Sequence, residues 1–241
     1  MRCSRKGAIA SLTNTDRLEC SMRFIRNNWY RMGLVAFAAA AVAVIAFAPE
    51  MDTTQRILLL SLMALPLHQY EEYALPGGGP AVINRYFYGE AENYRRYPGN
   101  WNSIMVVNLS AYVFYILALA FPQLTWLGMA TMFFNLYQVL GHCLQMNIKM
   151  GTWYNPGMAT SAFLFLPISV CYIAVVTGDG RMSSTDWALA VICFALIAAA
   201  SVALPVQLLK RTDSPYPIPQ WQVDRLEQVR SWASIGDHKG E

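Results

Sequence analysis

The sequence predicts an all-α fold, a polytopic bundle of about six transmembrane helices with both chain termini in the cytoplasm. Hydrophobic residues make up 55% of the 241 positions and charged residues only 14%, whereas a soluble domain usually carries about a quarter charged residues. Long apolar blocks alternate with short polar segments, and backbone groups in lipid have to pair within helices. Lysines and arginines also fall almost entirely on one side of such a bundle.

Six apolar segments are each close to the ~20 residues that a helix needs to cross about 30 Å of hydrocarbon. Pro49 and Pro122 end two of these segments, and the glycine run at 77–79 separates the second segment from a long polar loop. This glycine run lacks the Gly-Lys-Ser/Thr ending of a phosphate-binding loop, so we interpret it as a turn. The predicted spans are residues 29–48, 57–73, 103–121, 124–145, 158–176 and 187–209.

The predicted loops differ sharply in charge, which orients the bundle. The N-terminal tail carries seven lysines and arginines, the second loop three, the fourth loop one and the C-terminal tail five, whereas the opposite side has only Arg56 and Arg181. The positive-inside rule therefore places both termini in the cytoplasm, and we expect the cell (inner) membrane as the location. The basic residues lack the aromatic interleaving typical of RNA binding, so we expect membrane lipids and no nucleic acid as partners.

Three regions follow from this pattern. Residues 1–28 form a basic cytoplasmic tail, residues 29–209 form the six-helix transmembrane domain, and residues 210–241 form a cytoplasmic tail. The last region begins with a proline-rich spacer. A short amphipathic helix is expected after this spacer, over about residues 222–233.

The second predicted span ends in the sequence HQYEE at residues 68–72. His68 and Glu72 are four residues apart, so their side chains share one face of a helix, and Glu71 lies on the flank of the same arc. Ionisable groups at membrane depth are costly and usually serve a functional site. We therefore interpret this motif as the centre of the site.

A polar stripe follows the fourth predicted span. Its side chains recur at helical spacing, and a stripe of this kind facing lipid would cost several kcal/mol, so we expect it to face the bundle. Both spans run toward the cytoplasm, which places the histidine of the stripe at the same depth as the HQYEE carboxylates. The members of the stripe are Asn135, Gln138, His142 and Gln145.

Further polar groups on the same side complete a recognisable set. Asn108 lies in the third predicted span, and the fourth loop carries YNPG at 154–157, where Asn155 before a proline is typical of a helix start. HQYEE, the second histidine and YNPG together resemble the integral-membrane family named for its HXXEE motif, over roughly residues 57–176. The resemblance names no reaction or substrate. It implies functional roles, including a catalytic one for Tyr154, within the set His68, Glu71, Glu72, His142, Tyr154 and Gly157.

These side chains have the composition of a metal site. Catalytic zinc usually has about three protein ligands from histidine and carboxylate, with one position left for water. His68, Glu72 and His142 supply that set, so we predict zinc or another divalent metal, with Glu71 or Glu72 as general base. Asn135 or Gln138 is expected to hold the second nitrogen of His142. The amides expected to support the ligands are Asn108, Asn135, Gln138 and Asn155.

The sequence favours a membrane-embedded hydrolase, an amidase, peptidase or lipid hydrolase acting on a small-molecule, lipid or peptide substrate. A metal-free acid–base pair of glutamate and histidine is an alternative version of the same chemistry. Two other classes remain open: a non-catalytic ligand-binding or structural membrane protein, and a small transporter with a Glu/His ion site. The polar stripe fades outward beyond Asn135 and the chain shows no internal repeat, which disfavours transport. Nothing in the sequence indicates an oligomeric state.

Overall fold

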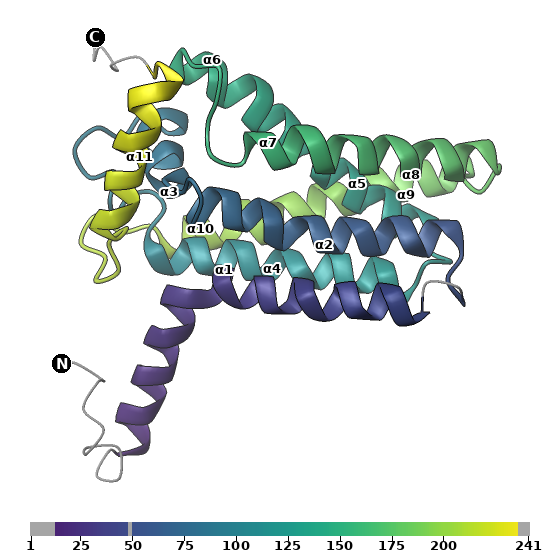
Figure 1. The fold of residues 1–241 in the computed structure, drawn as a ribbon, viewed down its shortest axis with the longest axis horizontal. Coiled ribbons are helices and arrows are strands. Elements are labelled where there is room, and N and C mark those ends of the chain that lie inside the picture. The colour runs from purple at the N-terminus through teal and green to yellow at the C-terminus, as the bar shows by residue number, and fades with distance from the viewer. Residues whose placement is uncertain (1–12, 48–49, 236–241) are drawn as a thin grey trace.

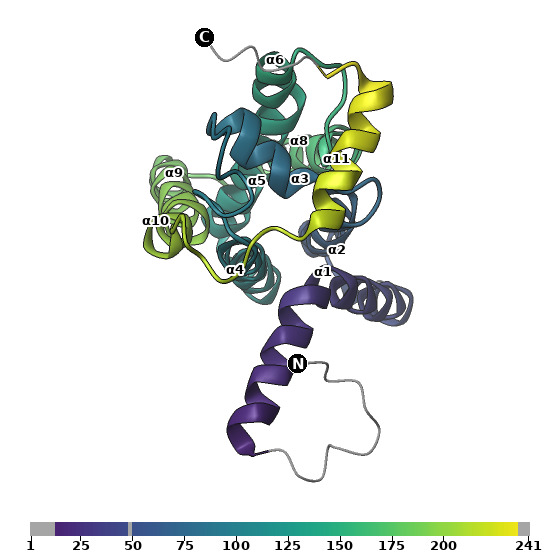
Figure 2. The same cartoon turned by 90° about the vertical axis from the view of Figure 1, so that its left-hand side faces the viewer.

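A computed structural model describes residues 13–47 and 50–235. Within these two stretches the protein is built from helices and contains no β-strand, which confirms the predicted all-α class. The long helices run roughly side by side, and a group of shorter helices covers one end of the bundle (Figures 1 and 2).

Capping boxes explain where several long helices begin. In a capping box, the side chain before the helix binds the backbone of the third helical residue, whose own side chain binds back. Such boxes start α2 (Thr53–Tyr73), α4 (Trp101–Ala120) and α9 (Ser184–Ala198). The paired residues are Asp52 with Gln55, Asn100 with Ser103 and Ser183 with Asp186.

The first helix, α1 (Asn14–Phe47), begins well before the first predicted span. Thr13 and Asp16 bond each other's side chains and backbone at its start. The described part of the predicted basic tail is therefore helical, and this part of α1 turns away from the bundle (purple in Figure 1).

The last three predicted segments are each interrupted by a π-helical turn. The fourth segment consists of α5 (Thr125–Val139), η4 (Leu140–Met146) and α6 (Asn147–Met150). Single π-turns inside α-helices frequently occur at functional sites, and His142 lies in this one. The fifth and sixth segments consist of α7 (Met158–Thr160), η5 (Ser161–Phe165) and α8 (Leu166–Gly178), then α9, η6 (Ala199–Ala203) and α10 (Leu204–Leu209).

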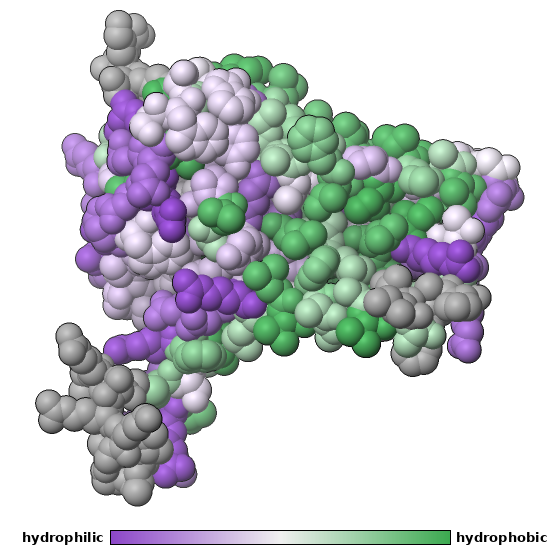
Figure 3. Space-filling view, in the orientation of Figure 1, coloured by the Kyte–Doolittle hydropathy of each residue, from purple (hydrophilic) through white to green (hydrophobic). Residues whose placement is uncertain are grey.

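Three helical stretches in the described part of the chain are long and apolar enough to cross a membrane: Trp101–Ala120, Met158–Gly178 and Ser184–Leu209. A hydrophobic surface band covers the middle of the molecule between a hydrophilic end and a smaller polar tip (Figure 3). Membrane association is thus confirmed at this coarser level. The count of six spans and the side on which the termini lie stay predictions.

Packing around α2 sets the depth of the polar motif. The helix contacts α1, α4 and α8, and α5 packs against α8 and α9. Leu58 of α2 is buried with Met129 and Met132 of α5 in one apolar cluster, and Leu65 is buried with Phe134 in a second. These two clusters hold α2 and α5 in a register that brings their polar ends to the same level.

Short helices form a compact polar end that covers the bundle beside the polar ends of α2 and α5. The segment predicted as a polar loop after the glycine run contains α3 (Gly79–Val82) and η3 (Ile83–Phe87). The C-terminal helix α11 (Gln220–Ala233) packs across them (yellow in Figure 1). Gln222 fixes this contact, because its side-chain amide accepts from Gly78 N at 2.7 Å and donates to Tyr73 O at 2.8 Å. The predicted amphipathic helix is therefore docked on the protein itself.

Candidate metal centre

His68 and Glu72 of α2 meet His142 of η4 in the interior of the bundle. Glu72 Oε1 lies 3.3 Å from His142 Nε2, and Glu72 Oε2 lies 3.8 Å from His68 Nε2. The two imidazole rings are 5.0 Å apart between centroids. All three side chains are buried, and their potential ligand atoms lie within 4.8 Å of one another. The tertiary structure thus brings together the three residues that the sequence singled out as metal ligands.

The loop after α6 fixes the tautomer of neutral His142. Its Nδ1 lies 2.8 Å from Asn155 Oδ1. The amide nitrogen of Asn155 donates to His142 O and to Asn147 Oδ1, both at 2.7 Å, which orients the amide so that its oxygen faces the ring. Nδ1 therefore carries the proton and donates it to Asn155. The remaining nitrogen, Nε2, presents a lone pair to Glu72.

A hydroxyl fixes the tautomer of His68 in the same way. Thr160 Oγ1 lies 2.9 Å from His68 Nδ1 and 2.5 Å from Glu71 Oε2. A carboxylate only accepts, so the single hydroxyl proton of Thr160 goes to Glu71 and its oxygen accepts from His68 Nδ1–H. The lone pair of His68 Nε2 then faces the cluster. This buried atom has no hydrogen-bond partner among the residues described.

In the resulting buried cluster, the lone pairs of His68 Nε2 and His142 Nε2 face the carboxylate oxygens of Glu72, and none of these atoms has a proton to donate to another. Protonation of His142 would pair that ring with Glu72, but it would leave His68 Nε2 without a partner. An unpaired buried polar atom costs about 1–3 kcal/mol, and a cation placed among the three groups removes that cost. Metal-bound histidines typically donate their second ring nitrogen to a carbonyl or carboxylate, as His142 donates to Asn155 here. The donor set therefore fits a divalent metal.

Glu71 points away from the cluster and has a different environment. Its carboxylate accepts four hydrogen bonds, from Ala159 N at 3.0 Å, Thr160 N at 2.7 Å, Thr160 Oγ1 at 2.5 Å and Tyr154 Oη at 2.8 Å. The two backbone donors lie at the first turn of α7, where a carboxylate is favourable. These bonds use the acceptor sites of both oxygens, so the geometry gives Glu71 a positioning role through Thr160 and does not favour it as general base.

Gly157 explains the last position of the YNPG sequence. Its φ of +98° suits glycine, and a Cβ there would lie 2.5 Å from His142 Cε1 and 3.0 Å from Glu72 Cγ. The loop backbone can approach both side chains only because this residue has no side chain. Three residues of YNPG thus support the site. Asn155 bonds His142, Tyr154 bonds Glu71, and Gly157 leaves space for the side chains of His142 and Glu72.

The predicted supporting amides divide into two groups. Asn155 makes the contact to His142 that was expected from Asn135 or Gln138. Asn135 instead accepts from Tyr115 Oη at 2.5 Å and donates to Ser61 Oγ at 2.9 Å. It joins α2, α4 and α5 about two helical turns from the cluster, since Ser61 lies seven residues before His68 on α2. The expectation failed for Asn135 because a side chain on the same helix cannot reach the ring edge that η4 turns toward the loop.

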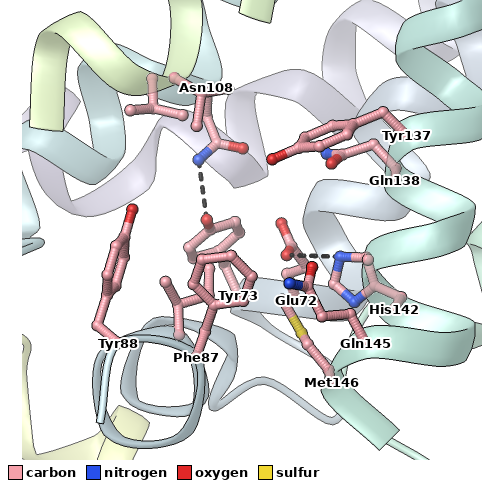
Figure 4. Close-up of a pocket in the computed structure, with 14 residues that line it drawn as sticks. Glu72, Tyr73, Phe87, Tyr88, Asn108, Tyr137, Gln138, His142, Gln145 and Met146 are labelled. Carbon is pink, nitrogen blue, oxygen red and sulfur yellow. Dashed lines mark hydrogen bonds and ion pairs between the residues drawn. The ribbon is translucent and has the colours of Figure 1, made fainter. Parts of the chain in front are cut away.

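A cavity of about 130 Å³ opens beside Glu72 and His142 (Figure 4). Asn108 and Gln138 line it, and Asn108 Nδ2 donates to the hydroxyl of Tyr73 at 2.8 Å. The rest of the wall is mainly apolar and aromatic, with Ile83, Phe87, Tyr88, Val107, Tyr137, Gly141, Gln145, Met146 and Val202.

Tyr73 is a residue of the site that the sequence reasoning missed. It lines the cavity and is buried, and its hydroxyl accepts from Asn108 and donates to the carboxylate of Glu72. Its position directly after Glu72 was the signal, but a tyrosine near the end of a span is more often part of an interfacial aromatic belt.

Residues 59–172 match the family model described as a protein of unknown function with HXXEE motif. The matched region contains the three clustered residues, Glu71 and the YNPG sequence. The resemblance drawn from these motifs is thereby confirmed over this region. No curated protein and no solved structure matches the chain.

Proposed function

We propose that this protein with an HXXEE-family region is a membrane-embedded, metal-dependent hydrolase that cleaves an amide or ester bond of an amphiphilic substrate, such as a lipid. The observation that carries the proposal is the unpaired Nε2 of buried His68, facing Glu72 and His142. Two histidines and one carboxylate are a donor set found in catalytic zinc sites. A divalent metal held by these three residues would act as a Lewis acid toward a carbonyl and favour ionisation of water.

The side chains around the cavity can each take a part in hydrolysis. Glu72 Oε2, the oxygen nearer His68, accepts the proton of a water that attacks the carbonyl carbon, and returns it to the leaving nitrogen or oxygen as the bond breaks. The hydroxyl of Tyr73, which bonds Glu72 in the substrate-free protein, turns its proton to the carbonyl oxygen as negative charge develops there. Asn108 holds the Tyr73 hydroxyl in place. Glu71 and Asn155 position the two imidazoles through Thr160 and by direct contact.

The cavity wall supports an amphiphilic substrate. Glu72 and His142 lie next to each other at one side, Asn108 lies apart from them above Tyr73, and the aromatic rings of Phe87, Tyr88 and Tyr137 form much of the rest (Figure 4). Pockets that bind small molecules combine such an apolar lining with a few placed polar groups. A carbonyl at the polar side with an apolar chain along the rings fits this arrangement.

The same proposal includes the orientation in the membrane. The asymmetry of lysine and arginine supports six crossings, both termini in the cytoplasm and the cell (inner) membrane as location. The metal centre then lies near the cytoplasmic face, because the polar end of the bundle with α11 covers the level of Glu72. A tag-accessibility assay on the two termini in sealed vesicles tests this orientation, and labelling of one terminus from the outside contradicts it.

Metal analysis of the purified full chain tests the centre itself. We expect about one divalent ion per chain in the wild type and in Asp224→Asn, which changes an exposed carboxylate on α11. His68→Ala, His142→Ala and Glu72→Gln should lose the ion, since each removes one of three ligands. Tyr73→Phe should keep the ion and lose most of its activity toward single-chain ester and amide substrates, about 100-fold. Equal, near-zero metal in all samples excludes the metal-dependent version and leaves the metal-free acid–base pair or a structural His–Glu pair.

A further inference from the structure

A second hollow in the surface lies between helices α1, α2 and α11. It has a volume of about 480 Å³ and shares no lining residue with the cavity beside Glu72. Its wall combines the start of the apolar part of α1, the end of α2 and one face of α11. We call it the basic groove, lined by Tyr30, Arg31, Leu34, Tyr70, Ala74, Leu75, Trp221 and Arg225.

Two guanidinium groups face this groove without a carboxylate partner. In the described part of the chain, Arg31 and Arg225 form no ion pair, and no acidic side chain lines the groove. Arg225 donates to Gln228 Oε1 at 3.2 Å, and the Arg31 guanidinium lies 5.7 Å from the Tyr30 ring. Asp224, the neighbour of Arg225 on α11, accepts from Gln220 instead. Both guanidiniums therefore keep free donors, and their fork geometry suits phosphate.

The groove joins charged and apolar surface, because exposed Arg31 and Arg225 line it together with Leu34 and the exposed Leu75. Trp221 is exposed there, as aromatic residues at membrane interfaces are, and lies beside the buried Tyr30 at 6.2 Å between ring centroids. Two exposed apolar side chains of α1 lie close to Arg31 in the sequence: Met32 follows it directly, and Val35 lies one turn further on. An occupant with an anionic head and an apolar chain would match both halves of this surface.

We propose that the basic groove binds the phosphate headgroup of an anionic phospholipid. Arg31 and Arg225 bind the phosphate oxygens, Trp221 and Tyr70 contact the glycerol region, and an acyl chain runs along α1 past Leu34 and Val35. The exposed apolar turn of α1 favours a membrane lipid over a soluble phosphate compound as the source of this phosphate. The bound lipid ties α11 to α1 and to the membrane surface.

This site is independent of the proposed hydrolase activity, but α11 connects the two places. Trp232 of α11 stacks near Tyr154 at 5.0 Å between centroids, and Thr152 Oγ1 donates to Ala233 O at 2.5 Å. A lipid in the basic groove would therefore also steady the loop that carries the YNPG sequence.

Native mass spectrometry of the full chain in detergent tests the proposal. Phosphatidylglycerol and phosphatidylcholine with the same acyl chains serve as lipids, and inorganic phosphate serves as the soluble source. We expect phosphatidylglycerol to bind more tightly than phosphatidylcholine. Affinity should fall about tenfold in Arg225→Gln and further in Arg31→Gln/Arg225→Gln. Arg211→Gln is the matched control, because it removes the same charge from an arginine bound to Asp213 and should keep the affinity.

Three results would overturn the lipid assignment. They are equal binding of the two lipids, equal phosphatidylglycerol affinity in the wild type and the double variant, and displacement of the lipid by millimolar inorganic phosphate. The last result would identify the groove as a site for free phosphate. Both arginines are exposed, so the variants should fold, and a thermal unfolding curve of each lipid-free variant checks this.

Discussion

Two polar clusters join α2 to the segment formed by α5 and η4, and they differ in one respect. Around Asn135, every group has a complementary partner: the amide oxygen accepts from Tyr115, and the amide nitrogen donates to Ser61. One level away, His68, His142 and Glu72 direct acceptors at one another, while their outer nitrogens are fully bonded. The first pattern is typical of polar contacts that hold membrane helices together. The second fits a bound cation, so we propose that the balance of donors and acceptors separates a structural contact from a metal site.

The largest effect is expected from Gly157→Ala. The new Cβ would press on His142 and Glu72 together, so metal affinity should fall about 100-fold, the upper end for disturbed ligand support. Gly151→Ala is the matched control, because Gly151 also has a positive φ, of +59°, but its Cβ would meet nothing within 4 Å. Metal titration and a melting curve for each variant separate the effect of the Cβ contact on metal affinity from the effect of backbone strain on stability. Equal loss of metal in both variants would mean that backbone strain, and not contact with the cluster, is responsible.

An intermediate effect is expected from a pair of asparagine variants that tests the comparison of clusters directly. Asn155→Ala removes the acceptor of His142 Nδ1–H, so metal affinity should drop about 10-fold or more. Asn135→Ala removes two hydrogen bonds between helices and should lower the free energy of unfolding by about 1–3 kcal/mol, with metal affinity unchanged. Metal titration and thermal unfolding of both proteins are the measurements. If Asn135→Ala also releases the metal, the two clusters are not separate.

The smallest effect is expected from Tyr154→Phe. This change removes one of the four hydrogen bonds to Glu71, so activity should fall only about threefold. Burial, and then the Glu71 carboxylate, raise the pKa of Tyr154 above its ordinary value of 10.0. The raised pKa keeps the phenol protonated, so its bond to Glu71 persists from neutral pH up to pH 10. The ratio of wild-type to variant activity should therefore stay constant between about pH 6 and pH 10. A ratio that changes across this range would point to a direct proton-transfer role for Tyr154.

Residue types and their spacing predicted which side chains meet at the site, but not the role of each one. HQYEE and the stripe through His142 identified the three clustered residues, because helical spacing places them on faces and charge asymmetry places them at one depth. The same reasoning could not rank Glu71 against Glu72. They are adjacent in sequence, and only the fold shows that one meets α7 and its donors while the other meets His142. The sequence identified Asn155 as a supporting residue, but the contact with His142 that Asn155 makes was expected from Asn135 or Gln138.

The sequence by itself determined the all-helical class, the approximate positions of most long helices and the three residues of the candidate metal centre, because these depend on hydrophobic runs and local periodicity. Tertiary structure alone decided three other matters. It folded the segment after the glycine run into α3 and η3, docked α11 across them, and turned the YNPG loop onto His142. These contacts join residues far apart in the chain, and their hydrogen bonds depend on directions in space that no local pattern records.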